Sequence, residues 1–557
     1  MTISVNKHIP IVIDLLLFLM VICFVLDCHQ MSGIRINNTF LSVLLMSIIY
    51  YVVRLLFCTI PFSFFVLLLV IVCSSLESFW GISQLLGFRH SNHIDYSITG
   101  SFDNPGPYGG FIAICVILLV AFCIKSTDFK NETIIHKLFY IVSCFLIITA
   151  IVVLPSTQSR SALLALGGGI FFISIGDIRI KNRVKPILRR YGLWIVPVIM
   201  VVVTSAYYFK KSSADGRLFM DKICVLSMCS NGLKGAGEGN FGGAYGDAQY
   251  EYFKKQIKKK GYDDLDWQAI KSHDRLTAEC PDNAFNEFLF IGVEYGPLYL
   301  FLFIITIVTA IVISFKRDTI WCYGMLAFAL FSLFSYPLHL KQFQILFPVL
   351  LAACVSDCSK QEKLNSGIVI NAVVFIILIT VLAKKIPDIK NSNQAETELK
   401  KMERWYRLED YEFVIYDCEE LLPYMDDQRY LFAYGQSFNK IGNYSMSDSL
   451  LIKGTKISSD PMFWNVMGNN SLAQGKYREA EERYKHAFYM VPNRLYPLVL
   501  LAKLYYTEGD TARFLEMTDV VEKFVPKVES IRTEKLRAEI RELKNSYLSE
   551  IEEKNED

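Results

Sequence analysis

The sequence has almost no net charge and contains long stretches with hardly any charged residue. Its 57 Lys and Arg residues nearly balance its 55 Asp and Glu residues, leaving a formal charge of +2. Without a global basic field, nucleic acid is not an expected partner. Apolar residues make up 52% of the chain and the mean hydropathy is +0.32. This composition excludes an ordinary soluble enzyme.

The apolar runs have lengths that match a bilayer. A helix of roughly 20 apolar residues crosses the hydrocarbon core. We therefore predict an all-α fold that begins with a polytopic membrane domain. The eleven predicted membrane helices cover residues 10–27, 40–58, 61–77, 109–124, 138–155, 161–176, 191–208, 287–314, 319–335, 342–357 and 367–384. The first run lacks a small-residue cleavage site, so it is predicted to be an uncleaved first helix.

The distribution of basic residues predicts the orientation. With the N-terminus inside, the short cytoplasmic segments carry fourteen Lys and Arg residues. The short outside loops carry only four, namely Arg35, Arg89, Arg160 and Lys341. The positive-inside rule therefore places the N-terminus in the cytoplasm and the long loop at 209–283 outside. An odd number of helices puts the tail outside too, whereas a count that differs by one after residue 284 would put it in the cytoplasm.

The sequence divides into four regions. Residues 1–384 form the predicted membrane domain with its large extracytoplasmic loop, 209–283. Residues 385–427 are predicted to be a linker and the first tail helices, residues 428–526 a repeat region, and residues 527–557 a charged C-terminal helix. Most of the fourteen cysteines lie in apolar runs, where they act as small hydrophobes. Cys224, Cys229 and Cys280 share the loop, where either a disulfide pair or free thiols fit the sequence.

The repeat region resembles tetratricopeptide repeats. Its clearest unit places large, small, small, aromatic, small and proline residues at Trp464, Gly468, Ala480, Tyr484, Ala487 and Pro492. Small residues let two helices approach closely, and the proline ends the second helix. Flanking units at 430–460 and 496–526 are degenerate, as end units commonly are. Such a stack is either a scaffold or a surface that binds a peptide or protein partner.

The chain also lacks a nucleotide-binding signature. The segment GAGEGNF at 235–241 resembles a glycine-rich phosphate-binding loop. It follows no hydrophobic strand, which argues against nucleotide binding. A site on the outer face would have no access to nucleoside triphosphates. The sequence therefore favours chemistry on a substrate that is already activated and linked to a lipid.

Four local patterns, read in order, resemble the O-antigen ligase-like superfamily. They are TGSFDNPG at 99–106, SRSAL at 159–163, GR at 216–217 followed by GAGEGNF at 235–241, and AFNEFL at 284–289 followed by VEYG at 293–296. The superfamily comprises O-antigen ligases, Wzy-type polymerases and protein O-oligosaccharyltransferases. The resemblance implies a glycan transfer from undecaprenyl pyrophosphate to an acceptor hydroxyl, with no metal and no cofactor. The acceptor is lipid A core, another glycan or a protein.

The resemblance also assigns roles to residues. Arg160 and Arg217 match arginines that neutralise the pyrophosphate, a role suited to a bidentate, permanently charged group. Their alternatives are an interfacial anchor for Arg160 and a loop surface charge for Arg217. Asn104, Asn240 and Asn286 match further substrate-binding positions.

The general base is where the chain departs from the family. Phe285 occupies the family's histidine position and cannot accept a proton. We predict that the neighbouring Glu287 is the base. A carboxylate at the start of an apolar helix costs free energy unless it is paired, so an unpaired one points to a function. Weaker candidates are His273 and Asp282, and His339 is predicted to line the lipid cleft or lie at the interface. A catalytically inactive assembly protein of a glycan export system remains the alternative from another functional class.

Overall fold

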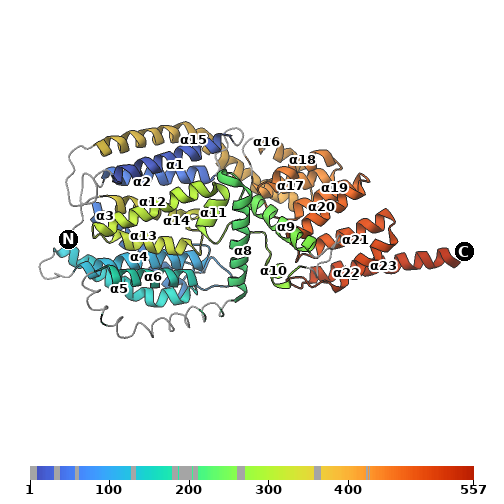
Figure 1. Ribbon diagram of the computed structural model, residues 1–557, viewed down its shortest axis with the longest axis horizontal. Helices are drawn as coiled ribbons and strands as arrows, with labels where there is room; N and C mark the ends of the chain where they lie inside the picture. Colours follow the sequence, from blue (N-terminus) through green and yellow to red (C-terminus); the bar gives the residue numbers. More distant parts are fainter. Residues whose placement is uncertain are drawn as a thin grey trace. The chain divides into compact units, whose positions relative to one another are not determined.

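The computed structural model describes residues 9–30, 38–56, 62–126, 133–177, 211–259, 270–356, 366–421 and 427–556, together with the single residues 186, 204, 208 and 425. Every regular element in these residues is a helix (Figure 1). The chain forms two compact units. We call Met1–Lys211, Ala284–Ile291 and Leu298–Ile386 the membrane unit, and Ser212–Asn283, Gly292–Pro297 and Pro387–Asp557 the loop–tail unit.

The membrane unit contains the apolar helices. They are α1 (Ile9–Gln30), α2 (Asn38–Leu56), α3 (Phe62–Leu85), α4 (Pro105–Lys125), α5 (Ile134–Ser156), α6 (Arg160–Gly176), the start of α11 (Glu287–Glu294), α12 (Gly296–Lys316), α13 (Trp321–Ser332), the 3₁₀ helix η3 (Pro337–His339), α14 (Lys341–Val355) and the first half of α15 (Ser366–Arg407). In the described residues, six of these helices are long and apolar enough to cross a membrane, and four shorter apolar helices accompany them. The predicted helix at 191–208 lies outside the described ranges, so the count of eleven stays a prediction.

The predicted helices at 287–314 and 367–384 differ most from the structure. The helix predicted at 287–314 is interrupted, because Gly296 has a φ of +84° and starts α12 as a separate helix. A Cβ at Gly296 would lie 2.1 Å from the carbonyl oxygen of Leu233, so the chain can turn there only with glycine. The helix predicted to end at 384 instead continues as α15 to Arg407, with Pro387 inside it. Hydropathy marks where apolar sequence ends, and a helix can continue beyond that point.

Helix α4 is the centre of the membrane unit. It contacts α3, α5, α6 and α13, and most of its side chains are buried. Small residues allow these close contacts: a Cβ at Gly110 would lie 2.2 Å from the Phe331 ring, and one at Gly169 would lie 2.6 Å from Ile117. Packing of this kind is what holds apolar helices together in lipid, where hydrophobic association offers little.

A buried ion pair joins four segments of the membrane unit. Asp14 of α1 is 1% exposed and lies 2.8 Å from Nη2 of Arg54 on α2. The Arg54 Nε donates to the other carboxylate oxygen at 3.0 Å, which makes the pair bidentate. Arg54 Nη1 donates to Ser356 Oγ at 3.0 Å, and Asn371 Nδ2 of α15 donates to Asp14 at 3.2 Å. Polar groups this well satisfied can remain inside an apolar helix bundle.

The loop–tail unit combines the long loop with the tail. The loop contributes α8 (Lys211–Ser230), the 3₁₀ helix η1 (Gly232–Lys234), α9 (Phe241–Lys259) and α10 (Ser272–Thr277). The tail contributes the second half of α15 and α16 (Tyr411–Leu421), α17 (Gln428–Lys440), α18 (Tyr444–Thr455), α19 (Met462–Ala473), α20 (Tyr477–Met490), α21 (Tyr496–Glu508), α22 (Thr511–Lys523) and α23 (Ile531–Glu556).

The tail helices pack as a stack of hairpins. From α16 to α23 each helix contacts the next, and α17, α19 and α21 contact one another in succession. Glycines permit the tight pairs: a Cβ at Gly468 would lie 2.3 Å from the Tyr484 ring, and one at Gly454 would lie 2.0 Å from the Phe463 ring. Gly468 therefore allows the close contact between α19 and α20.

Candidate functional site

Four helices of the membrane unit begin close to one another. The Ser159 hydroxyl at the start of α6 lies 3.3 Å from the Gly106 carbonyl in the first turn of α4. The Gln342 side chain at the start of α14 donates to Ser101, just before α4, at 3.2 Å. The Glu287 carboxylate at the start of α11 accepts from the backbone N–H of Leu338, just before α14, at 2.9 Å. We call this region, where α4, α6, α11 and α14 begin, the N-terminal cluster.

The segment before α4 is held by two side chains of α3. Gln84 accepts from the backbone N–H groups of Thr99 and Gly100 at 2.9 and 2.8 Å. Glu77 accepts from the backbone N–H of Ser101 at 3.1 Å and from its hydroxyl. These contacts fix the start of α4, the first of the four helix ends.

The predicted residues at α4 and α6 begin their helices. Asn104 caps α4, because its side-chain oxygen accepts from the Gly106 N–H at 2.9 Å. Arg160 is the first residue of α6 and is half-buried, behind the cap Ser159. The side-chain amide of Asn104 is therefore engaged in part by the backbone, whereas Arg160 stands where a helix N-terminus favours anions.

Glu287 is buried at the start of α11. It is 2% exposed, and the Leu338 N–H is its hydrogen-bond donor in the described structure. Burial raises the pKa of the Glu287 carboxyl to about 8, and the Leu338 hydrogen bond offsets part of this effect. A carboxylate with a raised pKa binds a proton more strongly, which suits a general base. Next to it, Asn286 caps α11 through the Leu289 N–H at 3.3 Å.

A histidine, His339, packs against α11, the helix that follows Phe285, where the family resemblance implies a histidine base. The Phe285 ring contacts Tyr336 at 5.4 Å between centroids, and the Tyr336 ring lies 6.3 Å from the His339 ring. The Phe290 ring also packs edge-on against His339 at 4.3 Å. The buried Nε2 of His339 has no hydrogen-bond partner among the described residues. Burial lowers the pKa of His339 to about 4, so the imidazole is neutral.

The sequence contained only a weak signal for His339. Tyr-Pro-Leu-His at 336–339 marks a turn between two apolar helices, but nothing in it reveals that the His339 ring packs against Phe290 of α11. This contact exists because η3 packs against α11, as the hydrogen bond from Leu338 to Glu287 also shows.

The other predicted site residues belong to the loop–tail unit. Arg217 is half-buried on α8. The Asn240 side chain donates to the Ala236 carbonyl at 3.0 Å and so stabilises the GAGEGNF segment itself. His273 lies on α10, and Asp282 accepts from the Gln428 side chain of the tail at 2.9 Å. Arg217 and Asn240 therefore fall in one compact unit, whereas Arg160, Asn104, Asn286 and Glu287 fall in the other.

The GAGEGNF segment wraps around the end of α11. Backbone N–H groups of Ala236 and Gly237 donate to the carbonyls of Val293 and Glu294 at 2.8 and 2.9 Å. The Glu294 side chain accepts from the Phe241 N–H at 3.3 Å. Burial, followed by the charge of Glu238, raises the pKa of Glu294 to about 8. Gly235 permits this close contact, because a Cβ there would lie 2.4 Å from the Glu294 carbonyl oxygen.

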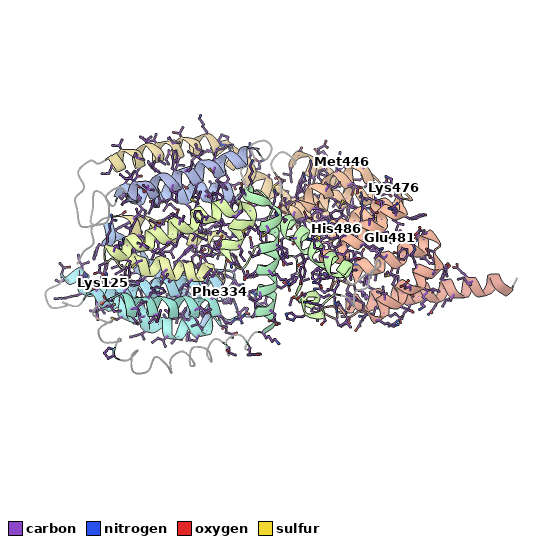
Figure 2. All side chains as sticks on the ribbon, in the orientation of Figure 1. Lys125, Phe334, Met446, Lys476, Glu481 and His486 are labelled. Atoms are coloured by element: carbon purple, nitrogen blue, oxygen red, sulfur yellow. The ribbon has the colours of Figure 1, made fainter. Side chains whose placement is uncertain are left out.

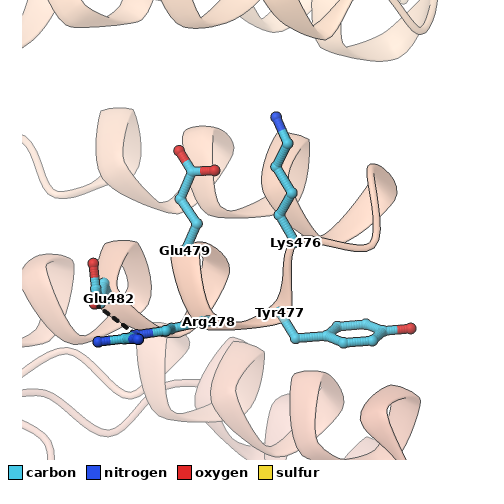
Figure 3. A pocket seen from close by; sticks show the side chains of 5 residues that line it. All are labelled: Lys476, Tyr477, Arg478, Glu479 and Glu482. Atoms are coloured by element: carbon cyan, nitrogen blue, oxygen red, sulfur yellow. Dashed lines mark ion pairs between the residues drawn. The ribbon is translucent and has the colours of Figure 1, made fainter.

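Cys224, Cys229 and Cys280 are free thiols in the structure. No group of three or more His, Cys, Asp or Glu side chains in the described residues is arranged to hold a metal ion. Figure 3 shows a shallow depression at the start of α20, lined by Lys476, Tyr477, Arg478, Glu479 and Glu482. Its charged side chains are of both signs, and Arg478 pairs with Glu482 at 3.5 Å. This open surface offers no enclosed ligand site.

No protein-family model matches the sequence, and no curated protein matches it either.

Proposed function

We propose that this protein transfers a glycan from undecaprenyl pyrophosphate to an acceptor hydroxyl on the outer face of the bacterial inner membrane. The observation that carries the proposal is the N-terminal cluster of the membrane unit. Each helix N-terminus presents about half a positive charge and unpaired N–H groups to an anion. Arg160 adds a full charge at one of these ends, and the buried carboxyl of Glu287 stands at another.

The reaction needs a positive charge beside the leaving pyrophosphate and a general base for the acceptor hydroxyl. The acceptor oxygen attacks the anomeric carbon of the glycan while the bond from that carbon to the pyrophosphate oxygen breaks. The proton of the acceptor hydroxyl passes to Glu287 acting as general base. The undecaprenyl pyrophosphate leaves as an anion, and Arg160 and Arg217 neutralise the charge that develops on it. Asn286 caps the helix that begins with Glu287, and Asn104 caps α4 in the same cluster, whereas Asn240 stabilises the GAGEGNF segment.

The tail bears on the choice of acceptor. We infer that residues 428–526 are tetratricopeptide-like, which the tight contact of Gly468 with Tyr484 supports. The proposed orientation puts this tail and the long loop in the periplasm. A lipid A core, a second glycan and a protein hydroxyl all remain candidate acceptors, and a Wzy-type polymerase is the nearest alternative within the same chemistry.

The test compares lipid-linked intermediates and surface glycans in cells that carry matched variants. Glu287→Gln should lower transfer by roughly 10² to 10⁴, the usual contribution of a general base. Arg160→Ala should lower it too, with lipid-linked glycan accumulating. Glu412→Gln and Arg404→Ala are the controls, because both side chains are exposed on tail helices. Unchanged glycan profiles in Glu287→Gln and Arg160→Ala, at normal protein levels, would refute the enzymatic proposal.

Phe285 is the reason for the non-catalytic alternative, which can be tested. Its ring contacts Tyr336 and can accept no proton. If the chain is an inactive assembly protein, deleting it should change glycan export while the Glu287 and Arg160 variants behave as wild type. The length of the accumulating lipid-linked glycan separates the remaining options: single repeat units indicate a polymerase, and long polymer indicates a ligase or a protein transferase.

A further inference from the structure

Helix α9 of the long loop lies in backbone contact with the tail. A Cβ at Gly243 would lie 2.1 Å from the Lys456 carbonyl oxygen, and one at Gly242 would lie 2.5 Å from that of Ile457. A Cβ at Gly246 would meet Met490 at 2.2 Å. Each glycine inside a helix costs about 1 kcal/mol relative to alanine. Three of them on one helix therefore point to an approach that no larger residue allows.

Hydrogen bonds donated by the loop and by the tail stabilise the packing between them. Gln249 of α9 donates to the Met490 carbonyl at the end of α20 at 2.5 Å. In the opposite direction, the tail side chain of Asn493 donates to the carbonyls of Arg275 on α10 and of Ala278 just after it, at 3.1 and 2.7 Å. Gln249 of α9 also donates to the Glu279 carbonyl at 3.0 Å, which joins this segment to α9. Gln249 and Asn493 are both almost fully buried, so these hydrogen bonds form away from solvent.

Aromatic rings complete the contact. His486 of α20, labelled in Figure 2, lies between two rings. Tyr250 of α9 stacks on it at 3.9 Å, and Trp464 of α19 stacks on it at 3.7 Å. A helix of the loop therefore packs against α20 and against the segment between α18 and α19.

Helix α9 in turn supports α8, which carries Arg217. The Phe219 ring of α8 packs against Tyr252 and Phe253 of α9, each at 5.8 Å between centroids. Ser227 of α8 donates to the Ala244 carbonyl of α9 at 3.0 Å. Because Phe219 is two residues from Arg217, whatever fixes α9 also fixes the helix that carries this arginine.

We propose that the binding partner of the tail is the chain's own α9, and that through this contact the tail positions Arg217. The second part rests on the proposed function, in which Arg217 neutralises the leaving pyrophosphate. Gly243 and Asn493 are then positioning residues. Gly243 acts on the reaction through α9 and α8, and Asn493 acts through the end of α10 and the adjoining Glu279, which Gln249 of α9 contacts. The tail does not need to touch the acceptor for its removal to stop transfer.

The experiment uses the full-length protein in nanodiscs and measures amide hydrogen exchange and glycan transfer on the same samples. Gly243→Ala adds only a methyl group and raises helix propensity, so any loss of protection in α9 reports lost docking. Asn493→Ala is a second, milder variant that removes two hydrogen bonds without a steric clash. Glu251→Ala is the matched control on an exposed site of α9.

We expect Gly243→Ala to speed exchange in α9 and in α8 by about tenfold, with α4 unchanged as the control for folding. Asn493→Ala should act in the same direction, and Glu251→Ala should have no effect. Transfer should fall in Gly243→Ala, and the double variant with Arg217→Ala should be no worse than Arg217→Ala alone.

Unchanged exchange in α8 in both docking variants would overturn the proposal. A loss of transfer that adds to that of Arg217→Ala would show that the tail acts by another route. If the wild-type protein transfers no glycan while Gly243→Ala still releases α8, the proposed function fails and the docking of α9 on the tail stands.

Discussion

Replacing Arg54 with methionine should destabilise the membrane unit strongly. The change removes both hydrogen bonds between the guanidinium and the Asp14 carboxylate, at 2.8 and 3.0 Å. Asp14 is 1% exposed, and the side-chain donors left to it among the described residues would be neutral, Tyr50 at 2.6 Å and Asn371 at 3.2 Å. Breaking a buried pair by removing one partner costs about 3–5 kcal/mol, since the remaining charge is uncompensated.

The double variant gives the sharper comparison. Asp14→Leu combined with Arg54→Met replaces both charges by apolar side chains, and such replacements are often neutral or stabilising by about 1–4 kcal/mol. A large loss in the single variant that is recovered in the double variant would therefore identify the unpaired charge as the cause.

The assay measures the unfolding midpoint of detergent-solubilised protein. Its readout is the fraction of protein that remains monodisperse on gel filtration. Lys125→Met is the control, because Lys125 pairs at 2.7 Å with an Asp318 side chain that is 80% exposed. Exposed pairs contribute about 0–1 kcal/mol. A midpoint shift in Arg54→Met no larger than that in Lys125→Met would refute the reasoning.

Three further predictions concern other parts of the chain. Gly468→Ala should destabilise the tail by about 1–3 kcal/mol, seen as faster proteolysis, because its Cβ would meet Tyr484 at 2.3 Å; Gly216→Ala, with no atom near its Cβ, should not. The loop–tail unit should lose stability by a few kcal/mol as pH rises from about 4.5 to about 8, since folding favours protonated Glu294 with its pKa of about 8; Glu294→Gln should remove this dependence in a proteolysis series across pH. Glycan transfer should rise with pH and level off above about 8, where Glu287 is ionised; a wild-type rate independent of pH between 6 and 9 would contradict Glu287 as the base.

Much of the helical architecture could be predicted from the local sequence. Whether a segment is apolar over about 20 residues depends only on neighbours in the chain, so hydropathy located the helices that could cross a membrane. It placed their ends less well, as Gly296 and the extension of α15 to Arg407 show. The glycine at 296 breaks a helix because of where Leu233 lies, which the local sequence does not record.

The candidate site depended more on tertiary structure. Motif order drew attention to Arg160, Asn286 and Glu287, and all three lie at helix starts of the membrane unit. The sequence could not reveal that Asn286 caps its own helix, or that the ring of His339 packs against Phe290 of that helix.

What the sequence determined by itself is a helical chain with apolar segments long enough for a bilayer and a hydrophilic tail. Only tertiary structure decided the partners: Arg54 with Asp14, Leu338 with Glu287, and α9 with the tail. The physical reason is how far apart in the sequence the interacting residues lie. Hydropathy and helix propensity act between neighbours, whereas close contact at Gly243 and charge pairing at Arg54 depend on segments that meet only after the chain has folded.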